Sequence, residues 1–338
     1  MATAPQTDAA SVGSFELLDL RHFSARQLRS LLEQESRVWQ QQLRWDYASS
    51  TELLLQYLDS RMLPGFVALI RGRICGYTFC VYEGAKAVIG DCYVARDVDP
   101  TLGLAGQLMQ ELLDLLLASP EISRIESQLL LFRPGQLAEP FRRAGFRSFP
   151  RLYQECELPG PLPAQTDALP ESLELVPWTA TAYHGAAELI HAAYAGHLDA
   201  QINDQYRSLE GSLRFLHNIV RFPGCGVFDP AASLLLRDRR TQTLVAVILC
   251  SRIAPDVTHI TQLCVAPAHR GRGLGRLLLD QCMRALPTLG YRAITLTVSE
   301  LNGAAVDLYR DSGFRTRHHF DAMVLDKTPA RFNLFASG

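Results

Sequence analysis

The sequence lacks the features that define several large classes of protein. Its eight cysteines are never spaced as C-x-x-C, so no zinc or thiol–disulfide motif is visible. Apolar runs such as Val245–Cys250 have the length of a strand and fall far short of the ~20 residues of a membrane-spanning helix. The formal net charge of −2 differs from the basic balance typical of nucleic-acid-binding proteins. We therefore expect neither a membrane nor a nucleic acid as a partner.

The first residues also lack a targeting segment. Residues 1–14 have no basic region followed by an apolar one, which predicts a disordered tail rather than a secretory signal. Several cysteines lie inside apolar segments, including Cys80 and Cys250, which indicates free buried thiols in a reducing compartment. The pair His318-His319 has no further ligand at useful spacing. These features favour a cytoplasmic protein without a metal.

A proline-rich stretch divides the chain into two parts of similar length. Residues 158–172 carry four prolines and little apolar periodicity, which is the composition of a linker. We therefore expect one domain over residues 15–157 and a second over residues 173–328, with a tail at residues 329–338.

Both halves read in the same order: strand, helix, helix, three strands, helix, strand, helix, strand. Three consecutive strands with short turns favour an antiparallel meander, and the later strand–helix–strand unit favours a parallel crossover. The sequence thus predicts a mixed α/β sandwich that occurs twice. In the second half, the expected helices cover residues 182–198, 208–220, 273–286 and 302–314.

The most distinctive stretch is His269–Leu279, HRGRGLGRLLL, where three arginines and three glycines precede a run of leucines. A helix N-terminus offers unpaired N–H groups, glycines admit a close approach of the ligand, and arginines bind phosphate oxygens. A pyrophosphate fits this combination. The stretch has neither the GK[ST] of a Walker A loop nor the G-x-G-x-x-G of a dinucleotide-binding fold. A solvated basic turn remains the alternative.

The segment Arg270–Gly275 reads R-x-x-G-x-G between a strand and a helix, and here the chain resembles the GCN5-related N-acetyltransferase (GNAT) family. The V-x-P step at Val265–Pro267 precedes this loop. A later helix matches the family pattern N-x-x-A-x-x-L-Y-x-x-x-G-F from Asn302 to Phe314. The resemblance covers most of residues 173–327 and implies two GNAT-like sandwiches in tandem.

The resemblance implies acetyl-coenzyme A as co-substrate and no metal. In this family a strand, here around Leu263–Val265, pairs with the pantetheine arm, and the N–H of Val265 would polarise the thioester carbonyl. The residues expected to bind the cofactor are Leu263, Cys264, Val265, Arg270, Gly271, Arg272, Gly273, Leu274, Gly275, Arg276 and Asn302.

Two residues are expected to transfer protons. Tyr309 stands where the family often places a general acid, and a phenol can protonate a departing thiolate of lower pKa. His259 stands where several family members carry a glutamate base, and a neutral imidazole can accept an amine proton. The alternatives are a packing tyrosine, a strand histidine that is only hydrogen-bonded, and a relay water held by Thr261 and Gln262.

The first half lacks this equipment. Aligned without gaps, Asp99 falls opposite Arg270, Val88 opposite His259 and Phe141 opposite Tyr309. An acid at the phosphate loop repels pyrophosphate, so we expect a degenerate copy that binds no cofactor.

The acceptor usually enters beside the first two helices in this family. In this chain that region is Gly196–Ser208, and Asp199, Asn203 and Tyr206 are the candidate acceptor residues; a merely solvated loop is the alternative. The resulting hypothesis is an N-acetyltransferase for a primary amine of a small molecule. Acetylation of a protein or peptide amine and a non-catalytic acetyl-CoA-binding module are the competing hypotheses. The acceptor and the oligomeric state are left open.

Overall fold

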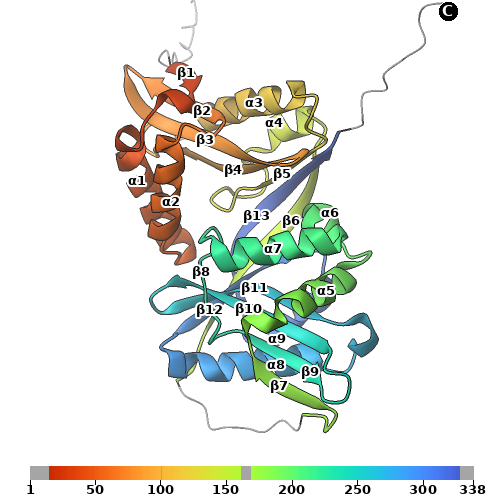
Figure 1. The fold of residues 1–338 in the computed structure, drawn as a ribbon. Coiled ribbons are helices and arrows are strands. Elements are labelled where there is room, and N and C mark those ends of the chain that lie inside the picture. The colour runs from red at the N-terminus through yellow and green to blue at the C-terminus, as the bar shows by residue number, and fades with distance from the viewer. Residues whose placement is uncertain (1–14, 100, 161–168, 328–338) are drawn as a thin grey trace, which may run out of the picture.

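The computed structural model describes residues 15–99, 101–160 and 169–327, and Figure 1 shows its fold. The predicted tails and the middle of the predicted linker lie outside these residues. The predicted elements are confirmed in type and order in both halves.

In the first half, the antiparallel meander β2–β3–β4 is preceded by β1 and followed by β5, which runs parallel to β4. Helices α1 and α2 cover one face of these strands, and α3 and α4 cover the other. The elements are β1 (Phe15–Asp19), α1 (Ala25–Leu43), α2 (Ala48–Asp59), β2 (Gly65–Ile70), β3 (Arg73–Glu83), β4 (Lys86–Val94), α3 (Gly103–Ala118), β5 (Arg124–Gln128), α4 (Ala138–Arg143) and β6 (Arg147–Glu157).

The second half repeats this arrangement, with the meander β9–β10–β11 and with β12 parallel to β11. Several short segments were not predicted: helix α6, the short strand β8, and the 3-10 helices η2 (Ala180–Ala182), η3, η4 (Pro267–His269) and η5 (Leu286–Leu289). The elements are β7 (Leu173–Pro177), α5 (Tyr183–Tyr194), α6 (Asp199–Ile202), η3 (Asp204–Arg207), α7 (Leu209–Arg221), β8 (Val227–Phe228), β9 (Leu234–Asp238), β10 (Leu244–Ala254), β11 (Val257–Val265), α8 (Leu274–Ala285), β12 (Ala293–Ser299), α9 (Gly303–Asp311) and β13 (Arg315–Asp326).

The two halves exchange their last strands, which the sequence did not predict. Within the described residues, the strands form one 13-stranded sheet with the order β1-β2-β3-β4-β5-β13-β6-β12-β11-β10-β9-β7. The final strand of the second half, β13, lies between β5 and β6, and the final strand of the first half, β6, lies between β13 and β12. Figure 1 shows both strands crossing the middle of the molecule. Each half therefore completes the sheet of the other.

A mixed apolar cluster closes the seam between the halves. Tyr153 of β6 and Phe320 of β13 are both fully buried, and they pack with Trp45 of the first half and Val257 of the second. Burial of one such side chain stabilises the fold by about 2–3 kcal/mol. The Tyr153 hydroxyl also donates a hydrogen bond of 3.0 Å to the Leu43 carbonyl.

Arg44 adds a polar clamp to this seam. It follows α1 with a left-handed φ of 55°. Its Nη1 atom donates to Glu155 at 2.6 Å and to Glu157 at 2.5 Å, both on the exchanged strand β6. Arg317 of β13 donates to the second oxygen of Glu155 at 2.8 Å. Helix α1, β6 and β13 are thus tied together by charge as well as by sheet pairing.

Among the described helices, none is long and apolar enough to cross a membrane.

The strand exchange predicts that the halves depend on each other. A protease site placed within residues 161–168 and then cleaved should leave the two fragments together, since each holds a central strand of the other. Size-exclusion chromatography of the cleaved protein should show one complex that unfolds in one transition. Residues 173–338 produced alone should be poorly soluble because β12 has then lost its neighbour. A soluble monomer of that fragment with the unfolding midpoint of the whole chain would contradict this prediction.

Candidate active site

The site begins where two parallel strands separate. Strand β11 pairs with β12 only along Val257–Ile260, whose partners in β12 are Ala293–Leu296. Beyond Leu296, β12 continues beside β6, while β11 continues beside β10. A gap therefore opens between them on the side of the Arg- and Gly-rich loop.

The backbone of β11 faces this gap with free donors. The N–H of Ala266 donates to the Val245 carbonyl of the neighbouring strand at 2.8 Å. Because backbone groups alternate along an antiparallel strand, the N–H groups of Leu263 and Val265 point the other way, into the gap. Both belong to the segment that was expected to pair with pantetheine.

The loop after β11 has the geometry of an anion site. Gly271 and Gly273 have φ values of 73° and 74°, which side chains other than glycine adopt only with strain. Gly273 is the N-cap of α8, and no side chain caps the first N–H groups of this helix. Arg270 is held beside them by donating to the Ala193 carbonyl at the end of α5. The uncapped helix end favours a phosphate.

The first half has the same turn but fills the anion position itself. Leu102 at the N-cap of α3 has a φ of 59°, close to that of Gly273. Asp99 accepts a hydrogen bond of 3.0 Å from the N–H of Ala105 in the first turn of that helix. Its carboxylate thus occupies the position in which a phosphate would lie. Phe141, opposite Tyr309, is 1% exposed and belongs to the core.

The loop, the gap and α9 line one cavity of about 950 Å³. Every predicted site residue except Arg272 contributes to its wall. These are Tyr309, His259, Leu263, Cys264, Val265, Arg270, Gly271, Gly273, Leu274, Gly275, Arg276, Asn302, Asp199, Asn203 and Tyr206.

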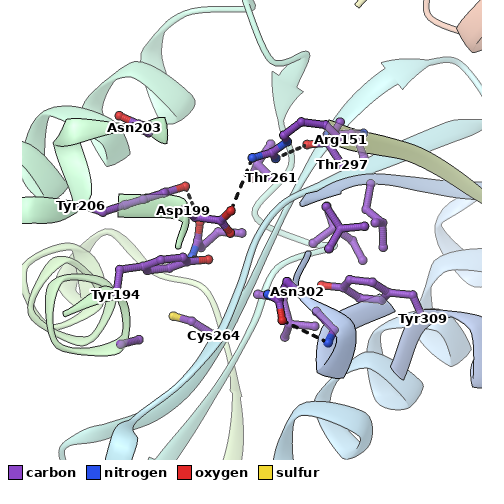
Figure 2. A pocket seen from close by; sticks show the side chains of 18 of the residues that line it. Arg151, Tyr194, Asp199, Asn203, Tyr206, Thr261, Cys264, Thr297, Asn302 and Tyr309 are labelled. Carbon is purple, nitrogen blue, oxygen red and sulfur yellow. Dashed lines mark hydrogen bonds and ion pairs between the residues drawn. The ribbon is translucent and has the colours of Figure 1, made fainter. Parts of the chain in front are cut away.

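Tyr309 reaches the cavity from α9, on the far side of the gap from Tyr194 and Tyr206 (Figure 2). It is 8% exposed and packs against Phe314, with ring centroids 5.6 Å apart. Burial, aided by the charge of Asp199, raises the pKa of its phenol well above the usual value. The phenol therefore carries its proton at neutral pH.

His259 is enclosed more tightly than its sequence position indicates. It is 5% exposed and lies between the rings of Trp45 and Tyr153, with centroids at 5.2 and 5.8 Å. Its Nδ1 atom is 2.8 Å from the hydroxyl oxygen of Thr295, which itself donates to the Thr258 carbonyl. Nδ1 therefore carries the proton and Nε2 is the acceptor. Burial, with the charge of Arg151, lowers the imidazole pKa to about 3.

The candidate acceptor residues have contacts of their own. The ring of Tyr206 stacks on that of Tyr194 at 4.1 Å, and its hydroxyl donates to Gln262 at 3.2 Å. The side chain of Asn203 caps η3 by accepting from the N–H of Gln205. Asp199 accepts from the hydroxyl of Ser299.

The first half supplies part of the wall, which the sequence interpretation missed. Arg151 of the exchanged strand β6 is one of these residues, and the others are Trp39, Trp45, Tyr47, Gly90, Asp91, Gln128 and Leu130. No local pattern marks them, because they reach the cavity through the strand exchange and the packing of α1.

Comparison with solved structures supports the fold. A GCN5-related N-acetyltransferase from Sphaerobacter thermophilus has a TM-score of 0.66 at 16% identity, covering 93% of this chain and 98% of its own. A tandem GNAT protein from the clavulanic acid biosynthesis pathway has a TM-score of 0.58 at 15% identity, covering 94% of this chain and all of its own. Both likenesses show a tandem GNAT-like arrangement.

Comparison of sequences places the family signal in the second half. A profile of the acetyltransferase (GNAT) family matches residues 198–314. Mycothiol acetyltransferase of Geodermatophilus obscurus is 46% identical over 65 residues, which cover 19% of this chain and 21% of that protein. The match thus spans about a fifth of that relative's length. The family profile covers the anion loop, β12 and α9, so residues 198–314 match the GNAT family of acetyltransferases.

Proposed function

We propose that the protein transfers an acetyl group from acetyl-CoA to the primary amine of a small molecule, in the cavity of the second half. The observation that carries this proposal is the meeting of three features in that cavity: the uncapped α8 with its glycine loop, the open edge of β11, and the buried Tyr309.

The cavity wall fits the parts of acetyl-CoA. The pyrophosphate would accept hydrogen bonds from the N–H groups of the Gly271–Gly275 loop. The pantetheine arm would extend the sheet along Leu263 and Val265, since their N–H groups face the gap. Nδ1 of His269, which is buried beside the loop and has no partner among the described residues, offers a further polar contact.

The reaction then follows from the positions of the donors. The neutral amine attacks the thioester carbon, and the N–H of Val265 stabilises the charge that develops on the carbonyl oxygen. As the C–S bond breaks, Tyr309 gives its proton to the sulfur. The new amide nitrogen releases one proton to water and Tyr309 regains one from solvent, so the products are an N-acetylated amine and free coenzyme A.

His259 would assist as a neutral hydrogen-bond acceptor. An imidazole with a pKa of about 3 is too weak a base to take a proton from an ammonium group and hold it. We propose that Nε2 orients the amine or a water, and that the proton leaves through water bound near Thr261 and Gln262.

Disruption of the anion loop should abolish cofactor binding. Arg270→Glu with Gly273→Asp places negative charge and bulk at the position of the pyrophosphate. Calorimetry should show one acetyl-CoA per wild-type chain and none in the double variant. Arg96→Glu, a similar charge reversal near the equivalent turn of the first half, is the control and should bind normally. Two equivalent sites, or unchanged affinity in the double variant, would refute the assignment.

Tyr309→Phe should keep the affinity for acetyl-CoA but lower kcat by about 10²–10⁴-fold, the usual cost of losing a general acid. Free-thiol release gives kcat, and calorimetry gives the affinity. Tyr183→Phe removes a phenol that donates to the Leu213 carbonyl outside the cavity, and serves as control. Unchanged turnover with rate-limiting chemistry would make Tyr309 a packing residue. An acetyl-CoA-binding module without catalysis would show no wild-type turnover.

The buried His259 should make the fold sensitive to acid. Its pKa is about 3 in the fold and near 6.5 in the unfolded chain, so the unfolded state binds one more proton between these values. Its contribution is complete above pH 6.5 and is lost as the pH falls toward 3. His259→Gln should therefore reduce the acid slope of the unfolding free energy by about 1.4 kcal/mol per pH unit between pH 4 and 6.

Denaturant titrations at several pH values measure this slope, with the exposed His184→Gln as control. An equal acid slope in wild type and His259→Gln would show that the imidazole titrates normally in the fold. If His259 acts only as a hydrogen-bond acceptor, the pH dependence of kcat/KM should follow the pKa of the acceptor amine. The wild type and His259→Gln should then show the same inflections.

A further inference from the structure

The cavity contains a guanidinium that the proposed reaction does not use. Arg151 reaches the cavity from the exchanged strand β6, and its side chain is only 11% exposed. Its Nη1 atom is 3.3 Å from the Ser299 hydroxyl, and its Nη2 atom is 3.4 Å from the Thr297 hydroxyl. Its Nε atom is buried without a partner among the described residues. Figure 2 shows this group beside Thr261 and Asp199.

These contacts are too long for an arginine that only braces the fold. Arg124 of β5 has similar burial and donates at 2.6 Å to Glu126 and at 2.5 Å to Asp326. Charge-assisted hydrogen bonds normally lie near 2.7–2.9 Å. The contacts of Arg151 are at 3.3 Å or more, and the nearest carboxylate oxygen, of Asp199, is 3.6 Å away. Arg151 therefore keeps most of its capacity to bind an anion.

Asp199 supplies the opposite charge at the same place. One of its oxygens accepts from Ser299 and faces Arg151, and the other is 3.7 Å from Nδ1 of His197. Its charge raises the pKa of Tyr309, so it lies within electrostatic reach of the proposed general acid. A positive and a negative side chain thus stand side by side near the reacting atoms.

The end of the cavity formed by the first half does not compete for a charged ligand group. Burial and the charge of Glu35 raise the pKa of Asp91 well above its usual value, which disfavours the charged form of this carboxyl. The rings of Trp39 and Tyr47 stack at 4.3 Å beside it. This end suits an uncharged or aromatic body.

We propose that the acceptor is an amino acid, or an amine with a carboxylate on the same or the next carbon atom, and that Arg151 binds this carboxylate. A guanidinium fork matches two carboxylate oxygens, and the long contacts of Nη1 and Nη2 leave Arg151 able to exchange them for such a ligand. The acceptor's ammonium group would lie toward Asp199 before it loses its proton and attacks the thioester. The role of the ammonium group as the attacking amine rests on the proposed function, whereas carboxylate binding by Arg151 does not.

A panel of matched acceptors tests the inference. Each of several amino acids is compared with its carboxamide, with its decarboxylated amine and with its aminophosphonate analogue, by thiol release from acetyl-CoA. The wild type should prefer the amino acid over the carboxamide by about ten- to a hundredfold in kcat/KM, the value of a hydrogen bond to a charged group. The phosphonate arm separates selection of a planar carboxylate from attraction of any anion. No preference in the wild type overturns the inference.

Variants of Arg151 test whether this residue causes the preference for a carboxylate. Arg151→Gln should raise KM for the amino acid by the same factor, leave kcat nearly unchanged, and leave the carboxamide unaffected. Arg151→Lys keeps the charge without the fork and should recover only part of the preference. Arg147→Gln, on the same strand but half exposed and paired with Asp326 at 3.3 Å outside the cavity, is the matched control. A preference that persists in Arg151→Gln overturns the role of Arg151.

A binding measurement separates this inference from the proposed function. Calorimetry in the presence of coenzyme A compares an N-acetyl amino acid with its N-acetyl carboxamide, in wild type and Arg151→Gln. Binding that requires both the carboxylate and Arg151, without turnover of any amine, supports the anion site and refutes the acetyl transfer. Turnover of amines without a carboxylate preference supports the acetyl transfer and refutes the anion site. Absence of both effects overturns this inference and the proposed function together.

Discussion

The pairing of β6 with β12 and β13 is the constraint on which the rest of the structure depends. Without it, β13 and β12 would each end in an unpaired edge, and their backbone N–H and C=O groups would lose their partners. The exchange joins the two halves through the sheet itself rather than through a surface contact. It also carries Tyr153 into the mixed core and Arg151 into the cavity, so stability and site composition come from the same strand.

The same pairing shapes the gap in which acetyl-CoA is proposed to bind. Strand β12 is paired with β6 as far as Ser299, while its pairing with β11 ends at Leu296. The free edge of β11 therefore stays open beside the N-terminus of α8. Beyond Leu296 β12 thus stays with a strand of the first half and apart from β11, so the first half helps to shape the gap in the second.

Local chemistry could be predicted from the sequence, whereas long-range pairing could not. The anion site at Arg270–Gly275 could be predicted because a helix end, its glycines and its arginines are neighbours in the chain. The strands β6 and β13 have similar lengths and follow the same Gly-Phe pair, so nothing local decides which half each one joins. Arg151 was missed for that reason. The burial of His259 between Trp45 and Tyr153 also depends on residues of the other half.

The two helix ends show how one backbone form can serve stability or binding. The turns before α3 and α8 share a left-handed N-cap, at Leu102 and at Gly273. Asp99 satisfies the first helix end internally, which stabilises the helix by about 1 kcal/mol but leaves no position for a phosphate. The end of α8 has no such side-chain cap, so its first N–H groups are available to an anion. The half with the uncapped helix end is the one proposed to bind acetyl-CoA, and the other half completes the shared sheet.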